Sequence, residues 1–345
     1  MVHSLYIFNP EHDLCLANGD SNFVPPASAM EFGRDCDSVV SIIGGDAPVV
    51  VWGWNPVIKR RLLRLGVSQD FLPSNECLAE IKKLSHRRWA AQAGEFVRNR
   101  MSLCEALLAG KVCEFSSLSQ IEDFLNLYGS AVLKAPWSGS GKGLRRVRKG
   151  AFSVSDSGWC RNIISSQGSV IAEREEKVVQ DFGVLFHIGG NTVSFEGYSL
   201  FYTDNCAYKG NVLASDRYIL DKLSSFVPAY VISDVVCCLK NFLEQNFLGR
   251  YNGFVGIDMF ICQSDGVYKL VPCVEINVRM TMGLLARRYY DNYFSKLHSG
   301  SDGKYCLEVV FSRDPASLSL LLAEAEDILT DAVNARHYAI AVFRT

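Results

Sequence analysis

Short apolar runs alternate with segments of helical spacing along the first part of the chain. Residues 5–8 and 49–52 are apolar runs of the kind that form buried strands. The apolar positions over 56–65 recur at helical spacing, and Gly66 stands where helices commonly end. This alternation predicts a small α/β unit with a parallel sheet over residues 1–75. Further helices are expected over 74–84 and 85–98.

The pattern after Ser85 predicts a second and larger region that mixes helices with strands, so we expect a domain boundary near this residue. Ser119 and Glu122 have the spacing of a capping box and are expected to open a helix that reaches Tyr128. Asp265 and Gly266 are a strong hairpin signal between two apolar strands. The other expected elements are strands over 131–135, 170–173, 179–188, 192–198, 254–262, 267–277, 307–311 and 337–343, and helices over 227–248, 282–294 and 316–332.

Composition places the chain among folded globular proteins. It has 345 residues, enough for two domains, with 48% hydrophobic and 21% charged residues. The net charge of -2 argues against a generally basic nucleic-acid binder. The 12 cysteines never show CxxC spacing, which indicates reduced thiols in a cytoplasmic protein. No apolar run approaches the roughly 20 residues of a membrane-spanning helix, so no membrane association is expected.

A loop rich in glycine and serine follows the strand that ends near Lys134. Gly139, Gly141 and Gly143 would let backbone N–H groups approach a polyphosphate, and Lys134 and Lys142 would add positive charge. The segment is not a Walker A motif, because no Gly-Lys-Ser/Thr opens a helix here. An ordinary glycine-rich hairpin with a surface lysine is the alternative. The basic run over 142–149 lacks interleaved aromatic residues, which favours a phosphate-facing lid over a nucleic-acid patch.

The geometry of the predicted hairpin follows from its turn. If Asp265 and Gly266 form a two-residue turn, Asp258 stands opposite Cys273, and Gly256 stands opposite Glu275. Asp258 and Glu275 are then diagonal neighbours, with backbones roughly 7–8 Å apart.

Alternation places three oxygen-bearing side chains on one face of this hairpin: Asp258, Glu275 and Asn277. Two carboxylates and an amide oxygen suit Mg²⁺, whose other ligands would be water and phosphate. Arg279 extends the line with a charge that is able to bind phosphate or carboxylate in a bidentate manner. A solvated polar strand face is the alternative. A third segment, 170–176, runs from an apolar strand into Glu173, Arg174 and Glu175, and by itself indicates only a strand end with solvated charges.

Taken in this order, the three segments resemble the ATP-grasp superfamily over about residues 86–290. The family pattern is a strand lysine with a glycine-rich loop, a hinge strand ending in Glu, a strand Asp, and a Glu-x-Asn-x-Arg strand. Here these are similar to Lys134 with 138–143, Glu173, Asp258, and 275–279. Val278 departs from the family, in which proline is common at this position.

The resemblance implies a fold and two domains. It implies an α/β and α+β protein in which a small Rossmann-like pre-ATP-grasp domain, 1–85, precedes an ATP-grasp domain, 86–345. Two subdomains of the latter would clamp the nucleotide, the lid subdomain covering about 112–172. The resemblance implies ATP with one or two Mg²⁺ ions as cofactors, with Mn²⁺ as an alternative.

The resemblance also implies roles for residues. Lys134 and Arg279 would be catalytic, Lys134 holding the nucleotide phosphates and Arg279 facing the transferred phosphate. Asp258, Glu275 and Asn277 would hold the metal. The other nucleotide-binding residues would be Ser138, Gly139, Ser140, Gly141, Gly143, Glu173, Arg174, Glu175 and one of Arg87 and Arg88.

The chemistry that the resemblance implies is a ligase reaction. ATP would activate a small-molecule carboxylate as an acyl-phosphate, and an amine or similar nucleophile would then form a C–N or C–S bond. A phosphotransferase on the same fold is the alternative, followed by a nucleotide-binding protein without turnover. No nucleic-acid or membrane partner is expected, and a homodimer stays open.

The acceptor site is the least specified part of the prediction. Asn9, Glu11, His12 and Asp13 directly follow the first strand, and ligands collect at the carboxyl ends of parallel strands. They are candidates for substrate binding, with a capped turn before a helix as the alternative. Trp52, after the second strand, would lie at the same edge and would stack a ring, or else pack in the core.

Overall fold

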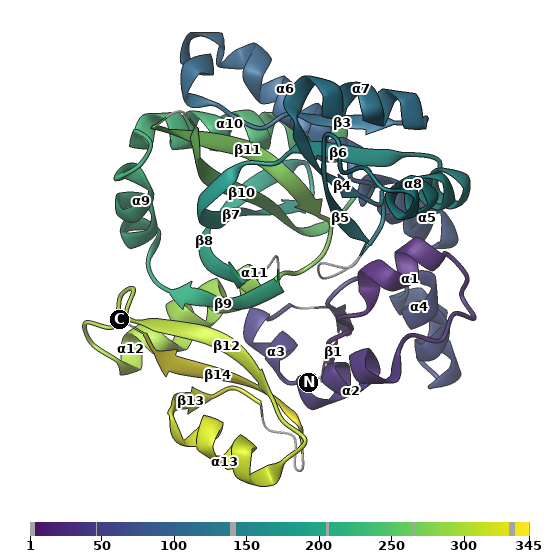
Figure 1. Ribbon diagram of the computed structural model, residues 1–345. Helices are drawn as coiled ribbons and strands as arrows, with labels where there is room; N and C mark the ends of the chain where they lie inside the picture. The colour runs from purple at the N-terminus through teal and green to yellow at the C-terminus, as the bar shows by residue number, and fades with distance from the viewer. Residues whose placement is uncertain are drawn as a thin grey trace.

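A computed structural model describes the chain over residues 4–45, 47–138, 143–204, 207–264, 266–330 and 335–344. Three β-sheets, of two, four and eight strands, organise these residues. In Figure 1 the eight-stranded sheet occupies the centre and continues to the lower left, where the C-terminal strands lie. The four-stranded sheet lies at the upper right, and the N-terminal helices lie below it.

The two-stranded sheet confirms the parallel pairing predicted near the N-terminus. Strands β1 (Leu5–Ile7) and β2 (Val49–Val51) pair in parallel, with Leu5 opposite Val49. Asn55 fixes the start of the following helix, because its side chain accepts hydrogen bonds from the N–H groups of Val57 and Ile58. The helices of this unit are α1 (His12–Asn18), α2 (Ala27–Asp35), α3 (Val39–Ile43), α4 (Pro56–Arg64) and α5 (Asn75–Leu84), with a short 3₁₀ turn, η1 (Gln69–Phe71).

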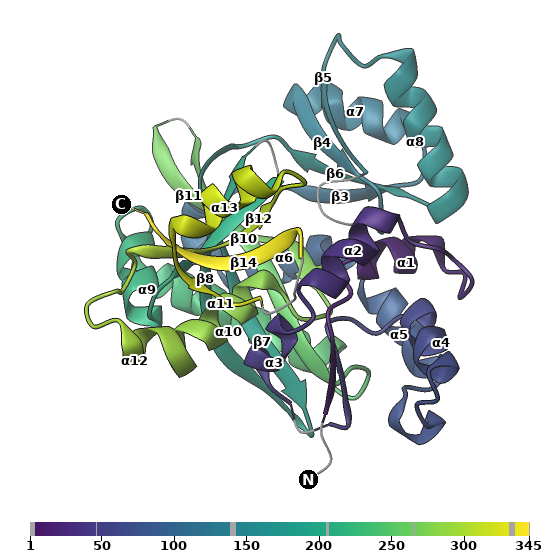
Figure 2. The same ribbon diagram turned by 90° about the horizontal axis from the view of Figure 1, so that it is seen from below.

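The four-stranded sheet is antiparallel throughout, in the order β3-β6-β4-β5. Its strands are β3 (Val112–Phe115), β4 (Ser130–Lys134), β5 (Leu144–Arg148) and β6 (Val170–Arg174). Helices α7 (Leu118–Tyr128) and α8 (Val154–Gln167) pack on it around a core that includes Phe124, Leu133 and Cys160. Figure 2 shows this unit projecting beside the N-terminal helices. The predicted capping box was two residues late, because Ser117 and Gln120 form it.

The eight-stranded sheet separates two layers of helices. Its strands are β7 (Lys177–Gly189), β8 (Thr192–Asp204), β9 (Ala207–Leu213), β10 (Gly253–Ser264), β11 (Val267–Asn277), β12 (Tyr305–Phe311), β13 (Ala325–Ile328) and β14 (His337–Phe343). Helices α6 (Arg88–Arg100) and α10 (Ala229–Asn246) pack on the face to which Val184 and Ile257 point. Helix α11 (Met282–Tyr289) and α3 cover the face to which Leu185 points.

The remaining helical segments are short and join the larger elements. They are η2 (Ser102–Leu107), α9 (Asp216–Ser224), the π-helical turn η3 (Tyr290–Phe294) and α12 (Ser295–Leu297). Within the described ranges, each helix by itself is too short or too polar to cross a membrane. The pair α9 and α10, bent by 119°, meets that requirement by length and composition alone.

The helix predicted over 316–332 was wrong in its second half. Helix α13 (Pro315–Ala323) follows Asp314, whose side chain caps the first turn, and it ends at Ala323. The chain then forms β13, which pairs with β14 at the edge of the large sheet. The backbone of β14 offers hydrogen-bonding groups here, and such pairing overrides local helix propensity.

The register of the β10–β11 hairpin differs from the prediction because the pairing shifts at a bulge. Ser264 faces Val267, as a two-residue turn requires, but Asp258 faces Glu275 and not Cys273, and Gly256 faces Asn277 and not Glu275. Residues 272–274 stand opposite the single residue Met259. Pro272 lies in this stretch and has no N–H for the ladder, which accounts for the break.

A buried amide joins the segments that follow β1 and β2. Asn9 is 1% exposed, its Nδ2 donates to the carbonyl oxygen of Gly53 at 2.8 Å, and its Oδ1 accepts from the Gly53 N–H at 3.1 Å. The side chain therefore serves as a backbone-like bridge between the two strand ends.

We expect Asn9→Ala to lower the free energy of unfolding by about 1–3 kcal/mol, because it leaves two buried backbone groups of Gly53 without partners. Urea denaturation measures this difference. Asn22→Ala is the matched control, since Asn22 is exposed and its side chain bonds to Asp20 two residues away, and it should change stability by less than about 0.5 kcal/mol. Equal stability of the Asn9 variant and the parent protein would contradict the bridging role.

Candidate active site

One cavity of about 580 Å³ collects most of the residues that the sequence singles out. Its described lining comes from β4, from the large sheet and from the N-terminal unit, three parts of the fold that are distant in sequence. The predicted site residues that line it are Asp13, Arg87, Lys134, Asp258, Glu275, Asn277 and Arg279. Side chains from both predicted domains therefore border a single space.

Lys134 forms a largely buried ion pair with Glu173. The two residues lie on the adjacent strands β4 and β6, and Lys134 Nζ lies 2.6 Å from Glu173 Oε1. The side chains are only 9% and 12% exposed. Removing one partner alone would leave a buried charge uncompensated, which typically costs about 3–5 kcal/mol.

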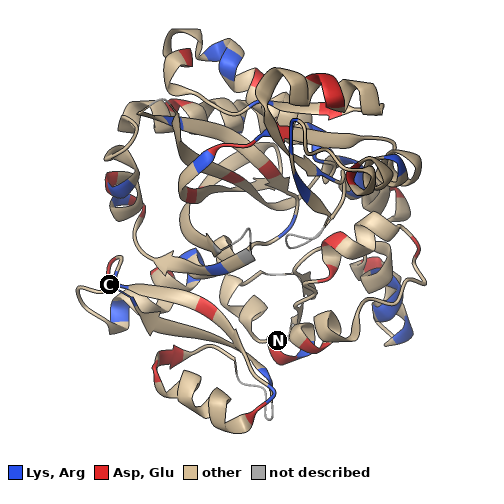
Figure 3. Ribbon diagram, in the orientation of Figure 1, with Lys and Arg blue, Asp and Glu red and all other residues tan. Residues whose placement is uncertain are grey.

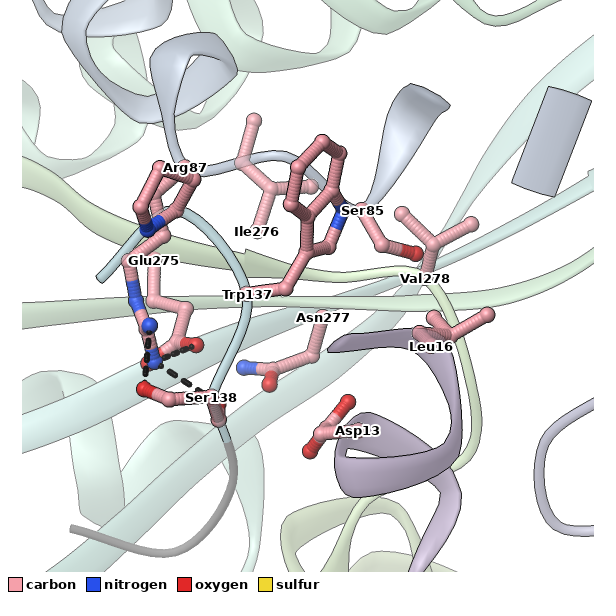
Figure 4. A pocket seen from close by; sticks show the side chains of 11 residues that line it. Asp13, Leu16, Ser85, Arg87, Trp137, Ser138, Glu275, Ile276, Asn277 and Val278 are labelled. Atoms are coloured by element: carbon pink, nitrogen blue, oxygen red, sulfur yellow. Dashed lines mark hydrogen bonds and ion pairs between the residues drawn. The ribbon is translucent and has the colours of Figure 1, made fainter. Parts of the chain in front are cut away.

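Arg87, and not Arg88, lies at the cavity. Arg87 donates through Nη1 to Ser138 Oγ at 2.6 Å and through Nη2 to Glu275 Oε1 at 2.7 Å. Figure 4 shows its guanidinium between these two residues. Arg88 is about half exposed and pairs with Glu114 at 2.9 Å. The structure thus brings Arg87 to the start of the glycine-rich loop and to a carboxylate of β11.

The glycine-rich loop is described only at its two ends. Gly139, Ser140, Gly141 and Lys142 lie outside the described residues. At the ends, the Ala135 N–H donates to the Gly143 carbonyl oxygen at 2.9 Å, so the loop starts and finishes at one place. Gly143 has φ +74°, and a Cβ there would lie 2.8 Å from Ser138 Cβ. Both the conformation and the close approach require glycine at this position.

The strand after the loop carries the basic run. Arg145 on β5 pairs with Asp156 at 3.1 Å, while Arg146 and Arg148 lie 3.9 and 4.0 Å from Glu175. Figure 3 shows basic and acidic residues interspersed over the four-stranded unit. Of the predicted hinge residues, Glu173 therefore pairs with Lys134, and Glu175 with the basic strand.

The third hinge residue points toward another acidic side chain. Arg174, about half exposed, lies 3.5 Å from Glu176 at the end of β6. Its N–H donates to the carbonyl oxygen of Lys111, which extends the pairing of β3 with β6. Its backbone is thus paired on both sides, with Ala131 of β4 on the other, at the end of an interior strand of the four-stranded sheet.

Asp258, Glu275 and Asn277 lie together on the cavity side of the hairpin. Asn277 Nδ2 donates to Asp258 Oδ2 at 3.0 Å, and Asp258 faces Glu275 across the strands. Burial, and then the charge of Glu275, raise the pKa of Asp258 to about 7. A divalent cation would relieve both effects, and the donors are hard oxygens. These residues therefore fit Mg²⁺, although no three His, Cys, Asp or Glu side chains cluster in the described part of the chain.

Arg279 and Asp13 form an ion pair between the end of β11 and helix α1. Arg279 Nη2 donates to Asp13 Oδ2 at 2.8 Å, and Nε contacts both carboxylate oxygens at 3.2 Å. Burial is the largest single effect on Asp13 and would raise its pKa, but the charge and hydrogen bonds of Arg279, together with the charges of His12 and Arg87, hold this pKa below its usual value. The guanidinium is therefore held in a fixed orientation beside the cavity.

The four residues predicted to bind the acceptor lie in different surroundings in the structure. Asp13 lines the cavity, whereas Asn9, Glu11 and His12 do not appear in its described lining. The Asn9 side chain instead donates a hydrogen bond to the carbonyl oxygen of Gly53. His12 is 1% exposed beside Asn55, and burial lowers its pKa to about 4. Glu11 is buried at the start of α1, where burial raises its pKa and its side chain makes no capping bond.

Other lining residues were not predicted from the sequence. They come from β8, β9, β12 and the start of α11, and include Ser199, Tyr208, Asn211, Met282 and Val309. No local motif marks them, because they are ordinary strand and helix residues that meet only when the sheet is assembled. Trp52, named as a ring-stacking candidate, also lines the cavity.

Comparison with known proteins identifies the fold. No family model matches this sequence, and no curated protein matches it. The ADP complex of purK, an N5-carboxyaminoimidazole ribonucleotide synthetase, aligns with 86% of this chain and 75% of its own, at 13% identity and a TM-score of 0.51. The synthetase from Thermus thermophilus aligns with 98% of this chain and 92% of its own, at 12% identity and a TM-score of 0.51. The chain therefore has the α/β ATP-grasp fold, which confirms the resemblance at the level of the fold.

The raised pKa of Asp258 predicts a pH-dependent effect of Asp258→Asn on the metal-free protein. Folded Asp258 holds its proton up to about pH 7, whereas an unfolded Asp releases it near pH 4, so this group lowers stability as pH rises between these values. At pH 8 the free energy of unfolding of the variant should exceed that of the parent protein by on the order of 2 kcal/mol. The gain should shrink at pH 5.

Urea denaturation at both pH values measures this difference. Asp123→Asn, at an exposed position on α7, is the control and should show little change at either pH. A gain that is the same at pH 5 and pH 8 would show that Asp258 does not titrate in this range.

Proposed function

We propose that this protein is an ATP- and Mg²⁺-dependent ligase, which activates a carboxylate as an acyl-phosphate and couples it to an amine or a similar nucleophile. The observation that carries the proposal is the single cavity bordered by Lys134, Asp258, Glu275, Asn277 and Arg279. The fold neighbours named above are synthetases, and one of them is an ADP complex, which supports a nucleotide in this cavity.

The proposed metal ligands are side-chain oxygens of the hairpin. Asp258, Glu275 and Asn277 would hold one or two Mg²⁺, or Mn²⁺, between their oxygens. The bound ion supplies charge stabilisation and orientation to the transferring phosphoryl group. Asn277 keeps Asp258 in place by the hydrogen bond that it donates, and Arg87 does the same for Glu275.

The cations of the cavity bind and orient the reacting groups. Lys134 would hold the nucleotide phosphates, with the backbone of 173–175 beside the adenine. The substrate carboxylate oxygen attacks the γ-phosphorus, ADP leaves, and the amine then displaces phosphate from the acyl carbon. Arg279 would stabilise the negative charge on the transferred phosphoryl group from a position that Asp13 has already fixed.

Arg87 acts through its neighbours in this proposal. It ties Ser138, where the glycine-rich loop begins, to Glu275 of the metal set. The proposal includes a domain boundary at residue 85 and a lid over about 112–172, which the four-stranded unit supports. A cytoplasmic location is also part of it, supported by the free thiol state of the 11 described cysteines.

The nucleotide role of Lys134 is tested with a double variant, because a single change would leave Glu173 buried and unpaired. ATP with Mg²⁺ should raise the melting temperature of the parent protein, since it binds the folded state alone. Lys134→Met combined with Glu173→Gln should abolish most of this shift. The exposed Lys111→Met is the control and should keep it. A full ATP shift in the double variant, measured by a thermal scan, would remove Lys134 from the nucleotide site.

The ligase reaction is distinguished from phosphotransfer by trapping its intermediate. In the presence of hydroxylamine, ATP and a panel of carboxylates, an acyl-phosphate should yield a hydroxamate and one ADP for each turnover. Arg279→Lys keeps the charge but loses the bidentate contact with Asp13, so it should lower the rate by about 10²-fold or more. Colorimetric hydroxamate and coupled ADP assays measure both quantities. A stable phosphorylated product without hydroxamate would replace the ligase with a phosphotransferase.

A further inference from the structure

Part of the cavity lining has no role in the nucleotide or metal chemistry. This part, here called the apolar wall, consists of Phe8, Phe32, Trp52, Leu185, Met282 and Val309. The three aromatic rings meet edge to face, with centroids 5.1 Å apart for Phe8 and Phe32 and 4.8 Å apart for Phe8 and Trp52. Such packing fixes the rings and leaves an apolar surface toward the cavity.

A small neutral patch completes this part of the lining. Asn211, which is 1% exposed, donates through Nδ2 to Ser199 Oγ at 2.7 Å and accepts from the Tyr208 hydroxyl at 2.5 Å. A Cβ at Gly283, where α11 begins, would lie 2.3 Å from Ser199 Oγ, so this helix approaches the patch as closely as glycine allows. The patch offers hydroxyl and amide groups and no charge.

The positive charges of the described lining are already matched by carboxylates. The three pairs are Arg87 with Glu275, Lys134 with Glu173, and Arg279 with Asp13. The apolar wall and the neutral patch themselves hold no cation, so a phosphate group placed on them would lose water without gaining a charged partner, and the burial of an unpaired charge is strongly unfavourable. An apolar group at the same place would bind favourably, because its free energy falls in proportion to the area that it buries.

We propose that the carboxylate substrate has an aromatic or branched aliphatic body that carries no phosphate, and that this body lies on the apolar wall. The inference rests on the proposed function, which places the carboxylate group beside Arg279 and the nucleotide. The wall then selects the substrate by shape and apolar contact, and it disfavours a phosphorylated body because none of its own side chains carries a charge.

The test is a binding experiment on the full chain saturated with Mg²⁺ and the non-hydrolysable nucleotide AMP-PNP. Hydrocinnamate and isocaproate are the apolar carboxylates, and phosphoglycolate is the phosphorylated one. Titration calorimetry should show the apolar probes binding at least about tenfold more tightly than phosphoglycolate. Tighter binding of phosphoglycolate, or no saturable binding of either apolar probe at millimolar concentrations, would overturn the inference.

A pair of variants locates the binding on the wall. Val309 lines the cavity, whereas its neighbour Val310 on β12 points to the other face of the sheet. Val309→Trp should fill the space and weaken hydrocinnamate binding about tenfold or more, while Val310→Trp should not. Phe32→Ala, at a half-buried position, provides a second test by removing one ring of the wall, and it should weaken the same probe. Unchanged hydrocinnamate affinity in folded Val309→Trp or in Phe32→Ala would overturn the inference.

A separate readout distinguishes this inference from the proposed function. AMP-PNP binding, followed by its thermal shift, depends on Lys134 and the metal set and not on the wall. If AMP-PNP does not raise the melting temperature of the parent protein, the nucleotide role is overturned together with the inference that rests on it. A normal AMP-PNP shift with tighter phosphoglycolate binding would overturn the inference about the wall alone.

Discussion

The ion pair between Asp13 and Arg279 holds the N-terminal unit against the large sheet. The two residues are 266 positions apart in sequence, and their side chains share three hydrogen bonds at the edge of the cavity. A backbone hydrogen bond from Met280 to the Trp52 carbonyl oxygen reinforces the same junction. This junction places Phe8, Phe32 and Trp52 of the N-terminal unit along the cavity.

Charge compensation is the second constraint on the site. The cavity brings cations and carboxylates together, and each cation of its described lining has a carboxylate partner. Asp258 faces Glu275 across the hairpin, and burial together with this charge makes Asp258 take up a proton more readily than a solvated Asp does. Because Arg87 already pairs with Glu275, Asp258 is the carboxylate here that a divalent cation would stabilise most.

The hairpin shows why a wrong register did not change which side chains share one face. The bulge at Pro272 moves the pairing partner of Asp258 by two residues, from Cys273 to Glu275. A shift by an even number keeps every side chain on its original face, so Asp258, Glu275 and Asn277 still share one. The bulge also moves the two carboxylates from diagonal to directly opposed positions, and this increases their electrostatic coupling. By contrast, the helix predicted past Ala323 failed because the edge of a distant strand determined the local structure.

The sequence by itself determined the fold class and singled out the charged and amide side chains of β4 and the hairpin that line the cavity, because these depend on short spacings and on strand alternation. The tertiary structure decided which of Arg87 and Arg88 reaches the cavity, which N-terminal residue reaches it, and which side chains form the apolar wall. Asn9 and Asp13 look alike in the sequence, yet one bridges two backbones and the other pairs with Arg279. That difference arises from packing between segments far apart along the chain, and no local pattern encodes such contacts.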